Sequence, residues 1–366
     1  MKKIFILLLF FSIAIGSFFL LKNCFFPLKK ADFSCANPAA VVSSLVLLPF
    51  SHPSLKENSQ IVLPTPPTES ALSQTQNTKI IFMAVGDMMF DRGVKTMVTK
   101  YGKADFAFSF AQIKDFLSQA DILFGNLEGP ISERGKKVGS IYSFRFARAI
   151  VETLKTIGFD VLSLANNHML DYQTIALEDT MNALQNAGID YVGAGFNTEQ
   201  AFALKIKEQQ GTKIGFLAFE NLGPATWQAG EHKTGMAWIS AKDFAQIQEN
   251  ISQAKSKVDI LIVSLHAGVE YQPMPDAFQK AFAQMAIEKG ADIVIGHHPH
   301  VVQPLIPYKN GWIAYSLGNF IFDQYFSPQT MQGAILKAEI KNKKIESVML
   351  QKIKLNRYYQ PQIAKD

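Results

Sequence analysis

Three histidines follow a short apolar run in the last third of the chain. The run Ile293–Ile295 ends at Gly296, and His297, His298 and His300 come directly after it. The run predicts a buried strand, and the glycine predicts the turn that ends it. Imidazole is a common ligand of transition metals, and open α/β sheets bind ligands beyond the carboxyl ends of their strands. The pattern therefore predicts a metal site here, provided that other strands bring ligands to the same edge.

Other predicted strands also end in side chains of ligand type. An isolated aspartate, asparagine or histidine in such a turn is more often structural. Turn chemistry alone does not readily place carboxylate, carboxamide and imidazole groups at five strand ends, so we interpret the set as one shared metal site. The other four ends carry Asp87 after Ile80–Val85, Glu128 after Ile122–Phe124, Asn166-Asn167-His168 after Val161–Leu164, and His266 after Ile260–Leu265.

The donor types indicate the class of metal and the chemistry. Carboxylate, carboxamide and imidazole without thiolate suit Mn, Zn or Fe, and the donors are numerous enough for two ions. Two ions about 3.5–4 Å apart are the usual arrangement for phosphoester hydrolysis, with a nearby protonated histidine to protonate the leaving oxygen. The chain has two cysteines, Cys24 and Cys35, both before the globular part. They could pair with each other, pair between chains, or remain unused thiols.

From Lys79 onward, apolar runs alternate with helical patterns. This alternation predicts an α/β core with much parallel pairing. The further strands expected in this part are Tyr191–Val192 and Ile214–Phe219, and the expected helices are Ala104–Gln119, Ala147–Ile157, Thr174–Ala187, Ala241–Lys255 and Ala277–Lys289. After His300 strands follow without helices, which predicts a meandering second sheet. These strands are Val301–Ile306, Trp312–Tyr315, Gly333–Ile340 and Ile345–Ile353.

The N-terminal residues have a different character. Ile4–Leu21 is a stretch of 18 residues without a charge, after the basic start Met1–Lys3. We interpret residues 1–30 as an uncleaved signal anchor, a transmembrane helix that passes once through the cytoplasmic membrane and leaves the globular part outside; a cleaved signal gives the same destination. Residues 31–78 are rich in proline, serine, glutamine and threonine and predict a flexible tether, although Val41–Phe50 could form a packed strand. The predicted domain is 79–358.

The charge of the chain lies at its N-terminus. The formal net charge is +5, and residues 1–30 hold five lysines and no acid, so residues 31–366 sum to about zero. A neutral body gives no support for a nucleic-acid partner.

Six ordered blocks carry a family resemblance. They are GDMMFDR, GNLEGP, ANNHMLD, LHAGVEY, GHHPHVVQP and YSLGNFIFD, within roughly residues 79–325. The chain resembles the CapA/PgsA capsule-synthesis family, which acts in poly-γ-glutamate biosynthesis and is related to the calcineurin-like metallophosphoesterases. The resemblance implies a four-layer α-β-β-α sandwich with helices on both outer faces.

The resemblance also implies roles for single residues. It implies that His168 is the general acid and that Asp171 orients it. His297 is then structural or supports a neighbouring ligand. The implied metal ligands are Asp87, Glu128 as the bridging carboxylate, Asn167, His266, His298 and His300.

One position departs from the phosphoesterase pattern. Met89 stands where those enzymes have a histidine, so either Asp91 substitutes for it or the first ion binds more weakly. This departure bears on whether the site has full binuclear phosphatase activity.

Four residues are candidates for substrate binding. Arg92 and Arg145 could meet an anionic substrate. Glu270, beside Tyr271, either faces the substrate or is a solvated loop acid, and Asn319 either fixes a turn near the site or binds metal.

The expected function follows from the resemblance. We expect a membrane-anchored extracytoplasmic protein with a metal-dependent hydrolase site, acting in synthesis or export of poly-γ-glutamate or a related capsular polymer. Its expected partners are an anionic polymer or a phosphoester substrate, the membrane, and a polymer-synthase complex. The alternatives are a phosphoesterase or peptide-type hydrolase unrelated to capsule, and a polymer-binding module without catalysis, because fold alone does not determine function.

Overall fold

The computed structural model describes residues 79–364. The predicted signal anchor, the tether and the two cysteines lie outside the described residues. Within residues 79–364, no helix has the length and apolar character needed to cross a membrane.

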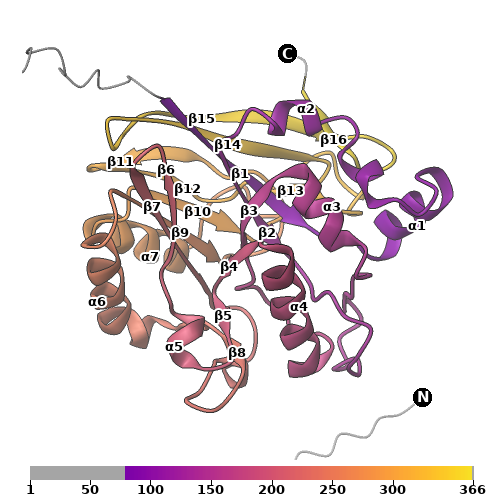
Figure 1. Cartoon of the computed structure of the whole chain (residues 1–366), viewed down its shortest axis with the longest axis horizontal. Helices are drawn as coiled ribbons and strands as arrows, with labels where there is room; N and C mark the ends of the chain where they lie inside the picture. Colours follow the sequence, from indigo (N-terminus) through magenta and orange to yellow (C-terminus); the bar gives the residue numbers. More distant parts are fainter. Residues whose placement is uncertain (1–78, 365–366) are drawn as a thin grey trace, which may run out of the picture. The chain divides into compact units, whose positions relative to one another are not determined.

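The first of two mixed sheets has eight strands, in the order β16-β15-β14-β1-β2-β3-β4 with β13 beside β1 (Figure 1). β1 to β4 run parallel, whereas β14, β15 and β16 are antiparallel to their neighbours. The strands are β1 (Lys79–Met88), β2 (Ile122–Leu127), β3 (Phe159–Ser163), β4 (Asp190–Val192), β13 (Asn319–Ile321), β14 (Gln332–Lys341), β15 (Lys344–Leu355) and β16 (Pro361–Ile363).

The second sheet has six strands, in the order β11-β12-β10-β9-β7-β6. Its four central strands are parallel, and the edge strands β6 and β11 are antiparallel to their neighbours. The strands are β6 (Lys205–Gln209), β7 (Thr212–Glu220), β9 (Ile260–His266), β10 (Ile293–His297), β11 (Leu305–Tyr308) and β12 (Gly311–Ala314), and a small separate pair joins β5 (Ala194–Gly195) to β8 (Gly235–Met236).

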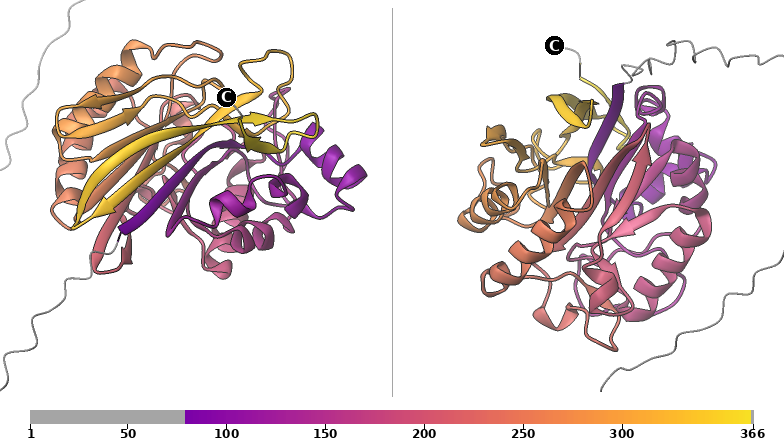
Figure 2. Two further views of the ribbon diagram at one scale, coloured as in Figure 1. Left: turned by 90° about the horizontal axis from the view of Figure 1, so that it is seen from above. Right: turned by 60° about the vertical axis from the view of Figure 1, so that its left-hand side comes forward.

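Helices cover the outer face of each sheet (Figure 2). Apolar residues of the first four α-helices pack on the first sheet, as Val94 and Leu177 do, and those of α6 and α7 pack on the second, as Ile251 and Phe282 do. The helices are α1 (Arg92–Tyr101), η1 (Phe106–Phe110), α2 (Lys114–Leu117), α3 (Ile150–Ile157), α4 (Gln173–Ala187), α5 (Thr198–Ala201), η2 (Ala225–Trp227), η3 (Ala241–Asp243), α6 (Phe244–Lys255) and α7 (Ala277–Glu288).

The inner faces of the two sheets pack on each other. Side chains alternate along a strand, so β1 turns Phe82 and Ala84 towards the second sheet and Met83 towards the helices. Between the sheets, the rings of Phe124 and Phe216 stack with centroids 5.9 Å apart and an interplanar angle of 7°. An aromatic pair of this kind contributes about 0.5–1.5 kcal/mol beyond its buried area. The layer order is therefore helices, sheet, sheet, helices.

The C-terminal strands do not form a sheet of their own, so that prediction was wrong. β12 adds parallel to β10 in the second sheet, and β14 adds antiparallel to β1 in the first. Each sheet thus combines parallel strands from the alternating part with later antiparallel strands. The first sheet also continues through β16, beyond the predicted boundary at residue 358.

Several element predictions were also wrong in detail. The helix expected over Ala104–Gln119 starts only at Phe106, because Lys103 and Ala104 take positive φ and Asp105 caps the new start. It is then split into η1 and α2 by a turn over residues 111–113, where Ile113 has φ of −133°. The strand expected over Val301–Ile306 begins only at Leu305.

Two glycines allow close backbone approach beside the strand ends. A Cβ on Gly86 would lie 2.0 Å from the carbonyl oxygen of Gly318, and one on Gly296 would lie 1.8 Å from that of Tyr315. Both distances exclude a side chain. Each glycine directly precedes a polar residue at its strand end, Asp87 or His297.

Candidate functional site

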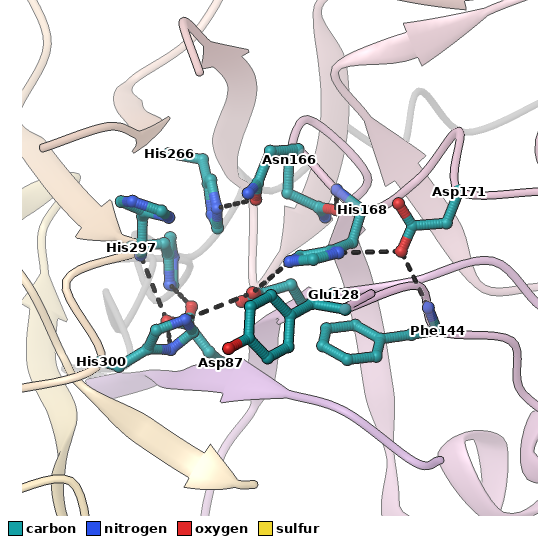
Figure 3. Close-up of polar contacts among 12 residues, drawn as sticks. Asp87, Glu128, Phe144, Asn166, His168, Asp171, His266, His297 and His300 are labelled. Carbon is teal, nitrogen blue, oxygen red and sulfur yellow. Dashed lines mark hydrogen bonds and ion pairs between the residues drawn. The ribbon is translucent and has the colours of Figure 1, made fainter. Parts of the chain in front are cut away.

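The strand ends of both sheets bring their polar side chains to one place (Figure 3). Asp87 and Glu128 come from the first sheet, and His266 comes from β9 of the second. These three residues each offer a ligand atom, and the three atoms lie within 4.8 Å of one another. The grouping is of the kind expected for a metal ion, and all three side chains are buried.

A second group of ligand atoms lies beside the first. Glu270, His298 and His300 offer atoms that also lie within 4.8 Å of one another. His300 links the two groups, because its Nδ1 is 3.4 Å from Asp87 Oδ2 and its Nε2 is 3.7 Å from Glu128 Oε1. The described residues therefore include two adjacent groups of potential ligand atoms.

Asp87 is the most heavily bonded carboxylate of the site. Its Oδ1 accepts a hydrogen bond from Asn126 Nδ2 at 2.9 Å and lies 3.1 Å from His297 Nδ1, and its Oδ2 accepts from the backbone N–H of His298 at 3.2 Å. Burial raises the pKa of Asp87, but the contacts with His297 and His300 outweigh burial and hold that pKa well below its ordinary value. His297 therefore supports the Asp87 carboxylate, one of the two roles expected for it.

Glu128 and His298 each keep a buried atom free. Glu128 Oε1 and His298 Nδ1 have no hydrogen-bond partner among the described residues. Burial and the charge of Asp87 raise the pKa of Glu128 well above its ordinary value, and burial, with a contribution from His300, lowers the pKa of His298 to about 3. A buried carboxylate oxygen and a neutral imidazole nitrogen without partners are costly unless a cation binds them. The donor set therefore fits divalent metal.

Asn167 lies against the same group. Its Oδ1 is 2.9 Å from His266 Nε2, so the structure brings the predicted carboxamide ligand to the predicted imidazole ligand. Burial lowers the pKa of His266 well below its ordinary value, which keeps the ring neutral and available as a ligand.

Two further asparagines position the carboxylates and were not assigned from the sequence. Asn126 Nδ2 contacts Asp87 Oδ1 and lies 3.3 Å from Glu128 Oε2. Asn166 in turn donates to Asn126 Oδ1 at 3.1 Å and to the carbonyl of Leu127 at 2.9 Å. Asn126 lies in the GNLEGP block and Asn166 in the ANNHMLD block. Their place in these blocks was the sequence signal that could have identified them.

His168 is held on two sides. Its Nδ1 lies 2.8 Å from Asp171 Oδ2, and its ring packs on Phe144 with centroids 4.2 Å apart. Asp171 Oδ2 also accepts the backbone N–H of Phe144 at 2.8 Å. With Nδ1 engaged, Nε2 remains free to exchange a proton, and it lies 3.9 Å from Glu128 Oε1.

A cavity of about 600 Å³ opens over this arrangement. Arg92 lines it, but its guanidinium pairs with Asp323 and lies over the Phe144 ring, 4.7 Å from the centroid. The polar residues that line the cavity are Arg92, Ser140, Tyr142, Asn167, His168, Glu270, Tyr271, His300, Asp323 and Gln324.

The structure corrects two of the predicted substrate contacts. Asn319 is fully buried, and its amide is engaged by His300 Nδ1 at 3.0 Å and by the Thr330 carbonyl at 2.9 Å, so it positions His300 instead. Arg145 does not line the cavity: its guanidinium lies 4.2 Å from the centroid of the Tyr172 ring.

Asp91 does not replace the histidine that is absent at Met89. Asp91 belongs to neither ligand group in the described part of the chain. Its carboxylate accepts the backbone N–H of Arg145 at 3.0 Å, and its own N–H donates to Met89 Sδ at 3.0 Å. Met89 itself is buried in the core.

Fold and site together define an α/β protein of two facing sheets whose strand ends hold a buried carboxylate–imidazole cluster. The family described as "Bacterial capsule synthesis protein PGA_cap" matches residues 81–324. The chain belongs to this family, and the relationship expected from the sequence blocks is confirmed.

Two relatives bear names from capsule biosynthesis. The chain is 34% identical to "Capsule biosynthesis protein CapA" of Bacillus anthracis, over 73% of this chain and 65% of that protein. It is 33% identical to "PGA biosynthesis protein CapA" of Bacillus subtilis (strain 168), over 70% of this chain and 67% of that one. The match thus spans about two thirds of each relative.

Two solved structures are similar at low identity. A novel phosphatase from Mycoplasma pneumoniae aligns with a TM-score of 0.44 at 18% identity, covering 77% of this chain and 96% of that one. A putative 5'-nucleotidase from Staphylococcus aureus aligns with a TM-score of 0.47 at 17% identity, covering 79% of this chain and 55% of that one.

Proposed function

We propose that this protein is a metal-dependent hydrolase of the cell envelope that cleaves a bond in an anionic capsular polymer, poly-γ-glutamate or a related chain. The observation that carries the proposal is the pair of unpartnered buried ligand atoms, Glu128 Oε1 and His298 Nδ1, beneath a cavity that His168 lines. Such atoms are costly unless a ligand such as a metal ion pairs with them.

The metal would be held by the residues that the strand ends supply. Asp87, Glu128 and His266 form one ligand group, and Asn167 lies beside it. The donor types suit Mn, Zn or Fe. A bound divalent ion supplies Lewis-acid polarisation of the bond that is cleaved.

The chain's own proton-transfer group is His168. Asp171 accepts from its Nδ1, so the imidazole presents Nε2 to the substrate as the donor of a proton to the leaving group. The Phe144 ring limits rotation of the imidazole, because it packs against one face of it.

A second cavity adjoins the first and leaves room for a substrate that extends beyond it. It has a volume of about 430 Å³ and shares Tyr271 and Phe326 with the first. Pro273, Val301 and Val302 line it, without a charged side chain. A polymer whose reacting bond lies over His168 would place neighbouring units here, and the relatives' names, with capsule and PGA biosynthesis, agree with such a substrate.

The proposal also includes the location. The uncharged stretch Ile4–Leu21 supports an anchor with a single pass through the cytoplasmic membrane and the catalytic domain outside, near a polymer-synthase complex. Protease added to intact spheroplasts should then degrade the domain, whereas a domain protected until lysis would contradict this location.

Turnover tests the function. The chain, supplied with Mn²⁺ or Zn²⁺, should hydrolyse γ-glutamyl peptides of several residues. Hydrolysis of simple phosphoesters alone would indicate a phosphoesterase unrelated to capsule. Bound metal and bound polymer without any turnover would indicate a binding module.

A further inference from the structure

Glu270 stands apart from the strand-end residues because it lies in the loop after β9, yet it meets two histidines of the loop after β10. Its carboxylate and ring nitrogens of His298 and His300 lie within 4.8 Å of one another. The two loops are fastened together, since the backbone N–H of Tyr271 donates to the carbonyl of Pro299 at 2.8 Å. This backbone hydrogen bond thus holds Glu270 close to the two histidines.

The site has a ligand atom without a partner. His298 is buried, and its Nδ1 has no hydrogen-bond partner among the described residues. The backbone of His298 has φ of 97° and that of His300 has φ of 57°, both left-handed. Positions of this kind are strained and tend to be retained where function needs the geometry.

The charges around the cavity also favour a bound cation. Arg92 is the lining cation, and Asp323 already pairs with it, while Glu270 faces the same cavity. Beneath the cavity lie Asp87 and Glu128, close to His300. An anionic polymer would meet net negative charge here unless cations neutralise it.

We propose that Glu270 is a metal ligand that holds a second divalent cation together with His298 and His300. The first cation belongs to Asp87, Glu128 and His266. Glu270 thereby supplies an anionic ligand to a centre that lacks a histidine at Met89, and it is neither a substrate contact nor a solvated loop acid. The inference rests on the proposed metal-dependent function and deepens it.

The arrangement around Glu270 suits a fixed ligand. The Tyr271 phenol is hydrogen-bonded to the Glu270 carboxylate. Gln324 Nε2 donates to the Tyr271 hydroxyl at 3.2 Å and fixes it from the other side. A hydrogen-bonded support of this kind orients a ligand.

Metal stoichiometry tests the inference without any activity measurement. The full chain in detergent is stripped with a chelator and titrated with Mn²⁺ by calorimetry, and bound Mn²⁺ is counted by elemental analysis after dialysis. We expect two ions per chain for the unchanged protein. In Glu270→Gln we expect one ion at unchanged affinity and the other at least about tenfold weaker. Glu270→Asp should recover part of the loss.

A matched control and two outcomes complete the test. Glu346→Gln changes an exposed acid on β15 that forms no ion pair within residues 79–364, and it should keep both ions. If Glu270→Gln and Glu270→Asp both bind two ions as tightly as the unchanged chain, the inference is overturned and the proposed function survives. If the unchanged chain binds no Mn²⁺ or Zn²⁺, both the inference and the proposed function fail.

Discussion

The Asp171 carboxylate orients His168 for its proposed role in proton transfer. Asp171 Oδ2 lies 2.8 Å from His168 Nδ1 and also accepts the N–H of Phe144, so it fixes both the tautomer and the ring position. In Asp171→Asn the amide oxygen can still accept from Phe144, but the compensating negative charge is gone. We expect kcat on γ-glutamyl peptides to fall by about 10²-fold, with KM and bound metal unchanged.

A surface aspartate serves as the control for this change. Asp179 on α4 pairs with Arg134 at the surface and lies outside the cavity lining, so Asp179→Asn should leave kcat unchanged. An Asp171→Asn protein with normal kcat would show that His168 does not act in proton transfer.

Glu220 is a buried acid outside the ligand groups and makes stability depend on pH. Its Oε2 accepts the backbone N–H groups of Leu222 and Gly223, but burial outweighs these bonds and raises the pKa of Glu220 to about 7. The unfolded chain releases this proton near pH 4.5, whereas the folded chain keeps it until about pH 7. The free energy of unfolding should therefore fall by about 3 kcal/mol as the pH rises through this window.

Urea unfolding of metal-free protein at several pH values measures this effect. Glu220→Gln has no proton to lose and still offers an amide oxygen to Leu222 and Gly223. Relative to the unchanged chain, its stability should rise by about 3 kcal/mol between pH 4.5 and pH 7.5. A constant difference across the window would mean that the Glu220 carboxylate titrates alike in both states.

At the scale of elements, the sequence predicted strands and strand ends better than it predicted sheets. Apolar runs and the polar residue that follows each one are local patterns, so the ends at Asp87 and His266 were correctly placed. Which strands pair depends on contacts between distant segments: Ala84 faces Leu336 across the β1–β14 pair, and no local pattern encodes that.

The same limit applies to residues of the site. Glu270 reaches the histidines because Tyr271 is hydrogen-bonded to Pro299, which the sequence does not reveal. Asn319 was expected near the substrate from its place in the YSLGNFIFD block, and Arg145 because its charge could meet an anionic substrate. Asn319 is instead buried against His300, and Arg145 packs on Tyr172. Position within a motif shows proximity to a site but not the direction of a side chain.

The close packing of β10 at Gly296 positions the histidines that follow this strand. Gly296 lies so close to the neighbouring strand that an added Cβ would be 1.8 Å from the carbonyl oxygen of Tyr315. Gly296→Ala must shift backbone, which we expect to cost about 1–3 kcal/mol and to weaken Mn²⁺ binding by moving the histidines that follow. Thermal unfolding and Mn²⁺ titration measure both effects.

Another glycine separates this effect from the general effect of adding a methyl group. At Gly230 the atom nearest to a new Cβ is Lys233 Cβ, 3.2 Å away, so a shift of a few tenths of an ångström relieves the contact. Gly230→Ala should therefore change stability little and leave metal affinity unchanged. Equal losses in both variants would contradict the role assigned to Gly296.

At the scale of the molecule, the site lies where two sheets converge, and both contribute to it. The first sheet brings Asp87 and Glu128, and the second brings His266 and His298. Without a cation, ionised Glu128 is costly at this junction, because burial and then the charge of Asp87 raise its pKa well above the ordinary value. A bound ion should therefore stabilise the whole fold, by about 2.7 kcal/mol at a concentration 100-fold above its dissociation constant.

Glu128→Gln distinguishes the destabilisation caused by burying this acid from the stabilisation gained when it binds a metal ion. The difference in unfolding temperature between the variant and the unchanged chain should change sign when metal is added. In chelator at pH 7, the variant should unfold at a temperature equal to or higher than that of the unchanged chain, since the amide avoids the cost of burying an acid beside Asp87. With saturating Mn²⁺ the order should reverse, because the unchanged chain gains the binding energy that the variant has lost. Calorimetric unfolding in both conditions measures the two differences. A variant that is less stable by the same amount in both would show that Glu128 supports the fold and holds no ion.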